Sequence, residues 1–308
     1  MLRRYVTIDV FTDRLFAGNP VAVVLDAQGL STRQMQALAV EFGYTETTFV
    51  LPPADPAHTA QVRIFTPDRE IPFAGHPNLG TAYALADDMT ARGIPVPDVF
   101  TFEEIAGKVN IELWRQDGRV VGAELRAPET LSCRAQIRAA QAAACLSLKE
   151  SDIRIDSHAP RVVSVGLPFL VVQLASRDAL ARVRPDRAAY ARLLPLDGAH
   201  SVYAYVLDGA RGAPDVHARM FTGRMTEDPA TGSATAAMAC LLARLRGLED
   251  LDLLVAQGDD MRRPSRLHAR ARAQDGAWHA HIGGHCVSAF TGTLPLDGEI
   301  DQAPLAMA

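Results

Sequence analysis

Short apolar runs and runs of alternating apolar and polar residues recur along the whole chain, a pattern typical of β-strands with one face in a core. The first half contains Tyr5–Val10, Val21–Leu25, Thr47–Leu51, Ala60–Phe65, Val109–Trp114 and Val120–Arg126. The second half contains Val162–Val165, Phe169–Leu174, Val202–Leu207, Val216–Phe221, Leu251–Ala256, Ser265–Ala273, Ala277–Ile282 and Cys286–Thr293. These runs predict that strands dominate the fold.

Helical periodicity is confined to fewer segments. In Thr32–Phe42 the apolar side chains fall on one face, and Gly43 follows as a helix stop. Two further helices are predicted at Ala135–Cys145 and Pro185–Leu194. Because strands and helices occur without a regular βαβ alternation, the predicted class is α+β rather than a doubly wound parallel sheet.

Two segments of helical composition stand apart because each contains 13 residues without Asp, Glu, Lys or Arg. They are Ala74–Ala86 and Thr231–Ala243, and both are rich in Ala, Gly and Leu. A helix that is apolar all round must be buried on every side. We therefore expect each half of the chain to wrap its strands around one central helix.

The sequences in front of these two segments resemble each other. Six residues match: Arg63, Phe65, Thr66, Glu70, Pro72 and Gly75 correspond to Arg219, Phe221, Thr222, Glu227, Pro229 and Gly232. The spacing is close to half the chain length, as expected for a duplicated domain. We predict an N-terminal half at residues 1–126 and a C-terminal half at residues 127–290. Residues 291–308 form a C-terminal segment that could return to the N-terminal half.

Composition excludes several classes of protein. The chain has 308 residues, 48% of them hydrophobic, and a net charge of −5, so no nucleic-acid partner is expected. Its apolar segments are shorter than the roughly 20 residues that span a bilayer, so no membrane partner is expected either. The cysteines (Cys133, Cys145, Cys240 and Cys286) show no zinc-like spacing and predict no metal site. A reducing, cytoplasmic location is expected.

The starts of the two uncharged helices are candidate binding sites. A helix N-terminus offers unpaired N–H groups and a partial positive charge to an anion. Gly75 and Gly232 would let a ligand approach the backbone closely. Two such termini facing one cleft would hold a small carboxylated molecule. Simple capping by Asp228, Thr231 and Ser233 is an equally good interpretation.

Three side chains carry candidate chemistry, each with a plainer alternative. His76 stands at a helix start, where capping or packing is the commoner role, and Asp228 before Pro229 resembles an ordinary turn. Glu46 opens an apolar strand, and an exposed carboxylate is the simpler interpretation there. A partly buried Glu46 would instead have a pKa raised toward neutrality, the condition that a general base needs.

Five ordered blocks resemble the phenazine biosynthesis PhzF-like proteins of the diaminopimelate epimerase-like fold superfamily. They are DVFTDRLFAGNPVAVV (9–24), TETTFVL (45–51), RIFTPDREIPFAGHPNLGTA (63–82), EDPATGSA (227–234) and RRPSRLHA (262–269). The resemblance implies two similar α/β halves, each a β-barrel-like sheet around a central helix and related by a pseudo-two-fold axis. It also implies an active site between the halves and a homodimer.

The same resemblance implies roles for individual residues. Glu46 would be the acid/base that moves a proton, with His76 and Asp228 as its polar partners. A substrate carboxylate would be bound by a set of residues at the two helix starts: Gly75, Thr231, Gly232 and Ser233. The best-known reaction of the family is the isomerisation of trans-2,3-dihydro-3-hydroxyanthranilate, which needs no cofactor.

The resemblance also has limits. Two-thiol racemases of this fold have Cys before each glycine, where this chain has Ala74 and Thr231, so that mechanism is not expected. Asn78 replaces a usual Thr or Leu, and Arg262 replaces a usual Gly. Two rivals remain: a carboxylate-based epimerase or isomerase of another small acid, and a non-catalytic small-ligand-binding protein on the same fold.

Overall fold

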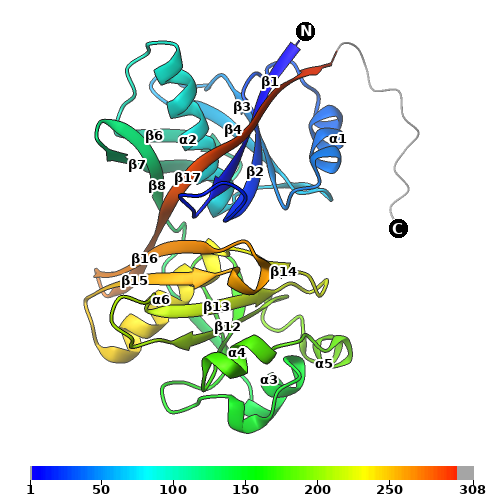
Figure 1. Ribbon diagram of the computed structural model, residues 1–308, viewed down its shortest axis with the longest axis vertical. Helices are drawn as coiled ribbons and strands as arrows, with labels where there is room; N and C mark the ends of the chain where they lie inside the picture. The colour runs from blue at the N-terminus through cyan, green and yellow to red at the C-terminus, as the bar shows by residue number, and fades with distance from the viewer. Residues whose placement is uncertain (1, 297–308) are drawn as a thin grey trace.

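One long strand, β17 (Ala277–Pro295), ties together the two lobes of the molecule (Figure 1). The computed structural model describes residues 2–296. Antiparallel partners succeed one another along β17, in the order β16 (Ser265–Gln274), β8 (Arg119–Arg126) and β1 (Leu2–Val10). The strands predicted separately at Ala277–Ile282 and Cys286–Thr293 are therefore one strand. That prediction was wrong because the intervening glycines stay extended and pair with β8.

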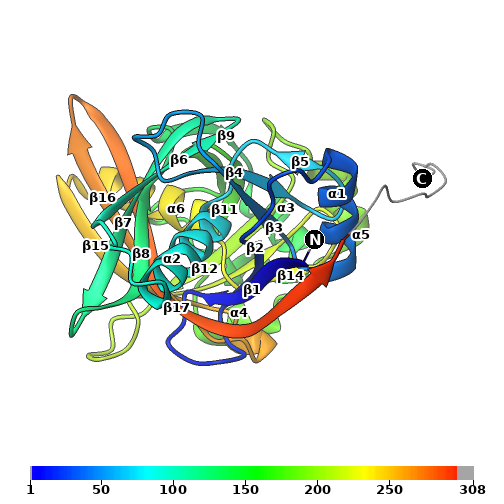
Figure 2. The ribbon, with the colours of Figure 1, turned by 90° about the horizontal axis from the view of Figure 1, so that it is seen from above.

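The strands of the first lobe close into a ring around α2 (Gly75–Ala91), which Figure 2 shows from above. In order, the ring contains β1, β2 (Asn19–Val24), β3 (Thr47–Leu51), β4 (Ala60–Phe65), β6 (Val99–Glu104), β7 (Gly107–Gln116), β8 and the last part of β17. The β2–β3 and β4–β6 pairings are parallel, and the others are antiparallel.

The second lobe repeats this order of pairings. It contains β10 (Arg161–Ser164), β11 (Pro168–Gln173), β12 (Val202–Leu207), β13 (Val216–Phe221), β15 (Asp250–Gln257), β16 and the first part of β17, with β9 (Ser132–Gln136) beside β10. Here β11–β12 and β13–β15 are the parallel pairs, at the same places in the order. These strands pack around α6 (Gly232–Arg246).

The two uncharged segments form buried helices, as predicted. Almost every residue from His76 to Ala86 is buried in α2, and α6 is buried from Gly232 to Ala243 except at Ser233. The two helices also contact each other. Three residues before each helix, a two-residue strand ends, β5 (Glu70–Ile71) or β14 (Glu227–Asp228), which pairs with β4 or β13.

Smaller helices cover the outer surfaces of the lobes. The helix predicted at Thr32–Phe42 is confirmed as α1, which has a Ser31 capping box and ends at Gly43 in the left-handed conformation. On the second lobe lie α3 (Ala139–Cys145), α4 (Arg177–Arg182), α5 (Arg187–Leu193) and the short 3₁₀ turns η1 (Glu150–Asp152) and η2 (Asp259–Met261). The helix predicted from Ala135 starts later because Ser132–Gln136 pairs with β10.

The fold is α+β, with a mixed sheet and helices as predicted. The division at residues 126 and 290 stays a prediction, although β17 already pairs with β1 from Cys286 onward. Residues 297–308 of the predicted C-terminal segment lie outside the described residues. Between residues 2 and 296, no helix is both long enough and apolar enough to cross a membrane.

Candidate active site

A cavity of about 590 Å³ lies where the N-terminal ends of α2 and α6 meet. The residues predicted from the sequence all line it: Glu46, Gly75, His76, Asp228, Thr231, Gly232 and Ser233. Apolar side chains from both lobes form much of the remaining wall, among them Phe73, Leu125, Val165, Phe169, Met220 and Ile282. Within the described part of the chain, no Lys or Arg lines the cavity.

Neither helix start is capped by a side chain. Ala74 precedes α2 with an extended backbone and has no side chain able to cap, and Thr231 precedes α6 without making a cap hydrogen bond. The interpretation of Thr231 as a simple side-chain cap of α6 is therefore wrong. The first N–H groups of both helices lie at the wall of the cavity, where they form two places of positive potential.

The two glycines at the helix starts have different surroundings. A side chain at Gly75 would enter open space, so nothing in the protein blocks approach to that backbone. A Cβ atom at Gly232 would lie 3.3 Å from both Ile282 and Phe11. At position 232, close packing inside the protein therefore favours glycine, whether or not a ligand approaches the backbone there.

Glu46 and His76 face each other at the cavity. The Oε2 atom of Glu46 lies 3.5 Å from the Nε2 atom of His76, and both side chains are largely buried. Burial raises the pKa of the Glu46 carboxyl to about 7 and lowers the pKa of the His76 imidazole to about 4. Of the two interpretations of Glu46, the structure supports the buried carboxyl, and His76 is neutral at physiological pH.

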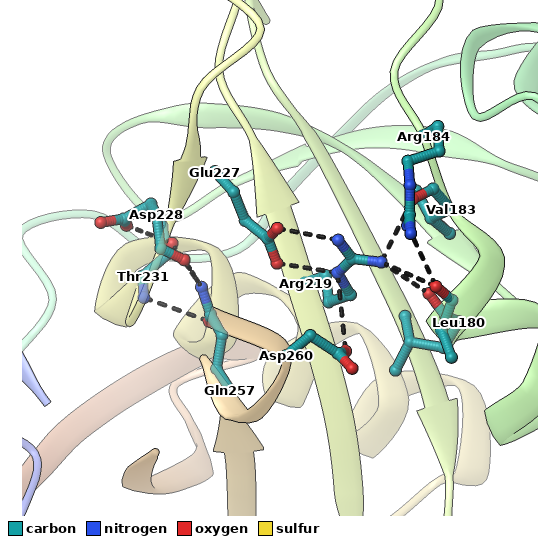
Figure 3. A network of polar contacts seen from close by, with 10 residues as sticks. Leu180, Val183, Arg184, Arg219, Glu227, Asp228, Thr231, Gln257 and Asp260 are labelled. Atoms are coloured by element: carbon teal, nitrogen blue, oxygen red, sulfur yellow. Dashed lines mark hydrogen bonds and ion pairs between the residues drawn. The ribbon is translucent and has the colours of Figure 1, made fainter. Parts of the chain in front are cut away.

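Asp228 sits in a network of neutral hydrogen-bond donors (Figure 3). Asn19 Nδ2 donates to Oδ1 at 2.9 Å, and the Thr231 hydroxyl donates to Oδ2 at 2.5 Å. Burial still raises the pKa of Asp228 to about 6, because these hydrogen bonds offset only part of the desolvation. Asp228 is thus a second buried carboxyl beside the cavity.

Sequence reasoning missed two residues that hold Asp228 in place. Asn19 bridges the Asp228 carboxylate and the Ala230 carbonyl. Gln257, at the end of β15, donates to the Asp228 carbonyl at 2.8 Å and accepts from the Thr231 N–H at 3.2 Å (Figure 3). The only signal was that Asn19 lies in one of the five blocks quoted above.

The residues that match between the halves form the same ion pair twice. Arg219 binds both carboxylate oxygens of Glu227, at 2.7 and 2.8 Å, and also donates to backbone carbonyls at the end of α4 (Figure 3). Arg63 binds Glu70 in the same way, at 2.7 and 2.6 Å. Each pair fixes a two-residue strand against its neighbour, close to the start of α2 or α6.

Residues 2–296 contain neither a metal-binding cluster nor a disulfide. No group of three or more His, Cys, Asp or Glu side chains there could hold a metal ion. All four cysteines are free, and Ala74 and Thr231 stand at the two positions where thiols would be needed.

The site lies between two lobes, each of which is built around one buried helix. The chain belongs to the phenazine biosynthesis-like family, whose sequence model (PhzC-PhzF) matches residues 8–292. An uncharacterized isomerase of Mesorhizobium japonicum is 40% identical over 95% of this chain and 98% of its own. The trans-2,3-dihydro-3-hydroxyanthranilate isomerase of Pseudomonas aeruginosa is 37% identical over 88% of this chain and 91% of its own.

Solved structures show the same fold. A PhzF-family phenazine biosynthesis protein of Bacillus anthracis superimposes with a TM-score of 0.85 at 24% identity, covering 96% of this chain and 100% of that one. A predicted epimerase of Pseudomonas aeruginosa superimposes with a TM-score of 0.74 at 33% identity, covering 96% of this chain and 100% of that one. A hydroxyproline epimerase of Agrobacterium vitis, at 17% identity and 0.63, shares the fold over 95% of this chain and 91% of its own.

Proposed function

We propose that the protein is a cofactor-independent isomerase that moves a proton on a small carboxylated substrate, with Glu46 as the acid and base. The observation that carries this proposal is the environment of Glu46. Its buried carboxyl, with a pKa of about 7, lines a cavity flanked by two helix N-termini. Such a group is partly ionised at physiological pH, so it can accept a proton and then return it.

Substrate binding follows from the two helix starts. The N–H groups near Gly75 and Gly232 and the hydroxyl of Ser233 would hold a carboxylate, since no Lys or Arg among the described residues lines the cavity. The matched order of strand pairings in the lobes supports a pseudo-two-fold relation that brings these two ends together. The apolar wall would enclose an uncharged ring or chain.

The reaction needs one acid/base group on the protein and two carbon atoms on the substrate. The Glu46 carboxylate removes a proton from one carbon, the π electrons shift along the substrate, and the carboxylic acid returns a proton to another carbon. No electrons are gained or lost, so no redox partner is required. The positive helix ends stabilise the negative charge that develops on the substrate.

The lead substrate is trans-2,3-dihydro-3-hydroxyanthranilate, because relatives at 35–37% identity carry that isomerase name. We also propose, on the family resemblance, that the protein works in the cytoplasm as a homodimer. Light scattering would test the dimer independently of the chemistry.

Turnover in D2O tests the proposed function. The wild-type protein should convert the lead substrate and place solvent deuterium on the carbon that receives the proton. A panel of small carboxylated molecules with an acidic C–H bond should be screened in parallel. Binding without turnover or exchange across the whole panel would favour a non-catalytic binding protein instead.

A further inference from the structure

Two buried polar side chains behind the start of α2 are not used by the proposed chemistry. Asn78, in the first turn of α2, is fully buried, and neither its Oδ1 nor its Nδ2 atom has a hydrogen-bond partner among the described residues. Glu104, the last residue of β6, has two buried carboxyl oxygens that also lack a partner there. Four unpaired polar atoms in one place are costly unless they satisfy one another.

These two residues are neighbours. The Asn78 amide acts on the Glu104 carboxyl as a hydrogen-bonding group, although the contact lies outside regular hydrogen-bond geometry. The turn after β6 also touches the segment before α2, because Ala106 N–H donates to the Pro72 carbonyl at 3.2 Å. Glu104 therefore lies where β6 meets the N-terminal end of α2.

The repeat identifies the counterpart of Glu104 in the other lobe. Gln61 pairs with Glu103 in the parallel β4–β6 ladder, and its counterpart His217 pairs with Ala256 in the β13–β15 ladder. One residue further along each second strand, Glu104 corresponds to Gln257. The residue matching Asn78 in α6, counted from the two glycines, is Thr235.

Gln257 shows what this position does. Its amide donates to the Asp228 carbonyl and the Thr231 hydroxyl and accepts from the Thr231 N–H, so it fixes the start of α6. These contacts require a side chain that can both donate and accept. A carboxylate only accepts, whereas a protonated carboxylic acid does both.

We propose that Glu104 is a neutral carboxylic acid that pairs with the amide of Asn78 and so positions the N-terminal turn of α2, including Gly75 and His76. The acid O–H donates to Asn78 Oδ1, and Asn78 Nδ2 donates to the acid carbonyl, which satisfies all four atoms. Glu104 is a positioning residue, and its effect on turnover rests on the proposed function.

The surroundings favour the neutral form. Burial raises the pKa of Glu104 to about 8, and the Asn78 amide opposes this only in part. Charged groups on the neighbouring elements have other partners or lie on other faces. On β6, Glu103 is bound to His58, and the exposed Lys108 of β7 lies opposite Glu103 in the sheet. On β4, Arg63 is bound to Glu70. On α2, His76 faces Glu46.

Ionisation of Glu104 would break the pair. The acid binds its proton more tightly in the folded protein than in the unfolded chain, so it costs the fold stability as pH rises from about 4.5 to about 8. Above pH 8 the acid loses its O–H donor, and one of the two hydrogen bonds between Glu104 and Asn78 is lost. Replacement by Gln keeps a donor and an acceptor at every pH.

Thermal unfolding of the full chain tests this without a substrate. The difference in Tm between Glu104→Gln and wild type should increase by at least about 3 °C from pH 5 to pH 9. Glu112→Gln, at an exposed site on the adjacent strand β7, is the matched control and should show no such increase. With Asn78→Leu in both backgrounds, the increase should be at least as large, because the Asn78 amide, which lowers the pKa of the Glu104 acid, is then gone.

The pH dependence of kcat/KM distinguishes a positioning role of Glu104 from a purely structural one, which would leave this dependence unchanged. In wild type, kcat/KM should fall above about pH 8, and Glu104→Gln should shift that fall to higher pH. A Tm difference that is constant from pH 5 to pH 9 would overturn the proposal. If the Tm difference grows but no turnover is found, the neutral pair stands and the proposed function fails.

Discussion

The Nε2 atom of His76 lies 3.5 Å from the Oε2 atom of Glu46, and within the described residues neither atom has a hydrogen-bond partner. The Pro20 carbonyl interacts with the same imidazole, which favours a proton on the ring nitrogen that faces Pro20. Nε2 then presents a lone pair to Glu46. A protonated Glu46 is stabilised by this contact and an ionised one is not, as suits a carboxyl that must hold a proton during the reaction.

Replacing Glu46 with Gln should abolish turnover, with kcat lowered by a factor of at least about 10³, because the same carboxyl both removes and returns the proton. The fold should be kept, since Gln is isosteric and the charge removed is a buried one. Steady-state kinetics and circular dichroism would measure the two effects. Glu41→Gln, at an exposed site on α1, is the matched control and should keep wild-type rates. Full activity in Glu46→Gln would rule out the proposed acid/base.

The pH dependence of kcat/KM should show an acidic limb with an apparent pKa near 7. The base form of Glu46 begins the reaction, so activity rises as the pH passes the pKa of its buried carboxyl. Asp228, with a pKa near 6, broadens this limb because the two carboxyls interact. His76 loses its proton near pH 4 and leaves no mark above pH 5. A profile that is flat from pH 5 to pH 7.5 would contradict the assignment.

Thr231→Val should lower kcat/KM by roughly 10-fold to 100-fold, which corresponds to about 1–3 kcal/mol for an unsatisfied buried acceptor. The variant loses the 2.5 Å hydrogen bond to Asp228 Oδ2 and leaves Gln257 Nε2 with one acceptor fewer. The pKa of Asp228 should rise further, because that hydroxyl now lowers it. Thr231→Ser keeps the hydroxyl and is the control. Equal losses in both variants would mean that the methyl group, and not the hydrogen bond, matters.

The two buried helices could be predicted from sequence because their signal is local. Thirteen consecutive residues without a charge cannot form a solvated helix, so Ala74–Ala86 and Thr231–Ala243 had to lie inside. The matched Arg and Glu residues had no evident role in the sequence. The structure shows them as two ion pairs that hold the segments before α2 and α6.

The carboxyl environments could not be predicted, because they depend on contacts distant in sequence. Asn19 reaches Asp228 across 209 residues, and no local pattern records such a contact. The burial of Glu46 likewise depends on walls from both lobes, so the sequence left an exposed carboxylate as the simpler interpretation. The helix predicted from Ala135 failed for a related reason: pairing with β10 outweighed the helical pattern of its first residues.

Arg219→Met should destabilise the protein by about 3–5 kcal/mol, because it leaves Glu227 and two backbone carbonyls without their buried partner. The equivalent Arg63→Met should cost less, about 1–2 kcal/mol, since Arg63 and Glu70 are more exposed. Urea unfolding at pH 7 would compare the two. Adding Glu227→Gln to Arg219→Met should recover part of the loss. Equal costs for both arginines would show that burial does not set the strength of these pairs.

Arg262→Gly should stabilise the protein slightly, by about 1 kcal/mol or less. Arg262 is exposed and follows η2 with φ of 58°, in the left-handed region where a side chain costs about 1–2 kcal/mol and glycine does not. The gain is reduced because glycine also makes the unfolded chain more flexible. The N–H at position 262 donates to the Asp259 carbonyl, and glycine keeps this hydrogen bond. Arg262→Ala is the matched control: it removes the same side chain but keeps the Cβ atom and should give no gain. Thermal unfolding would separate the two variants, and a higher Tm for alanine than for glycine would show that backbone strain at this residue is not the cause.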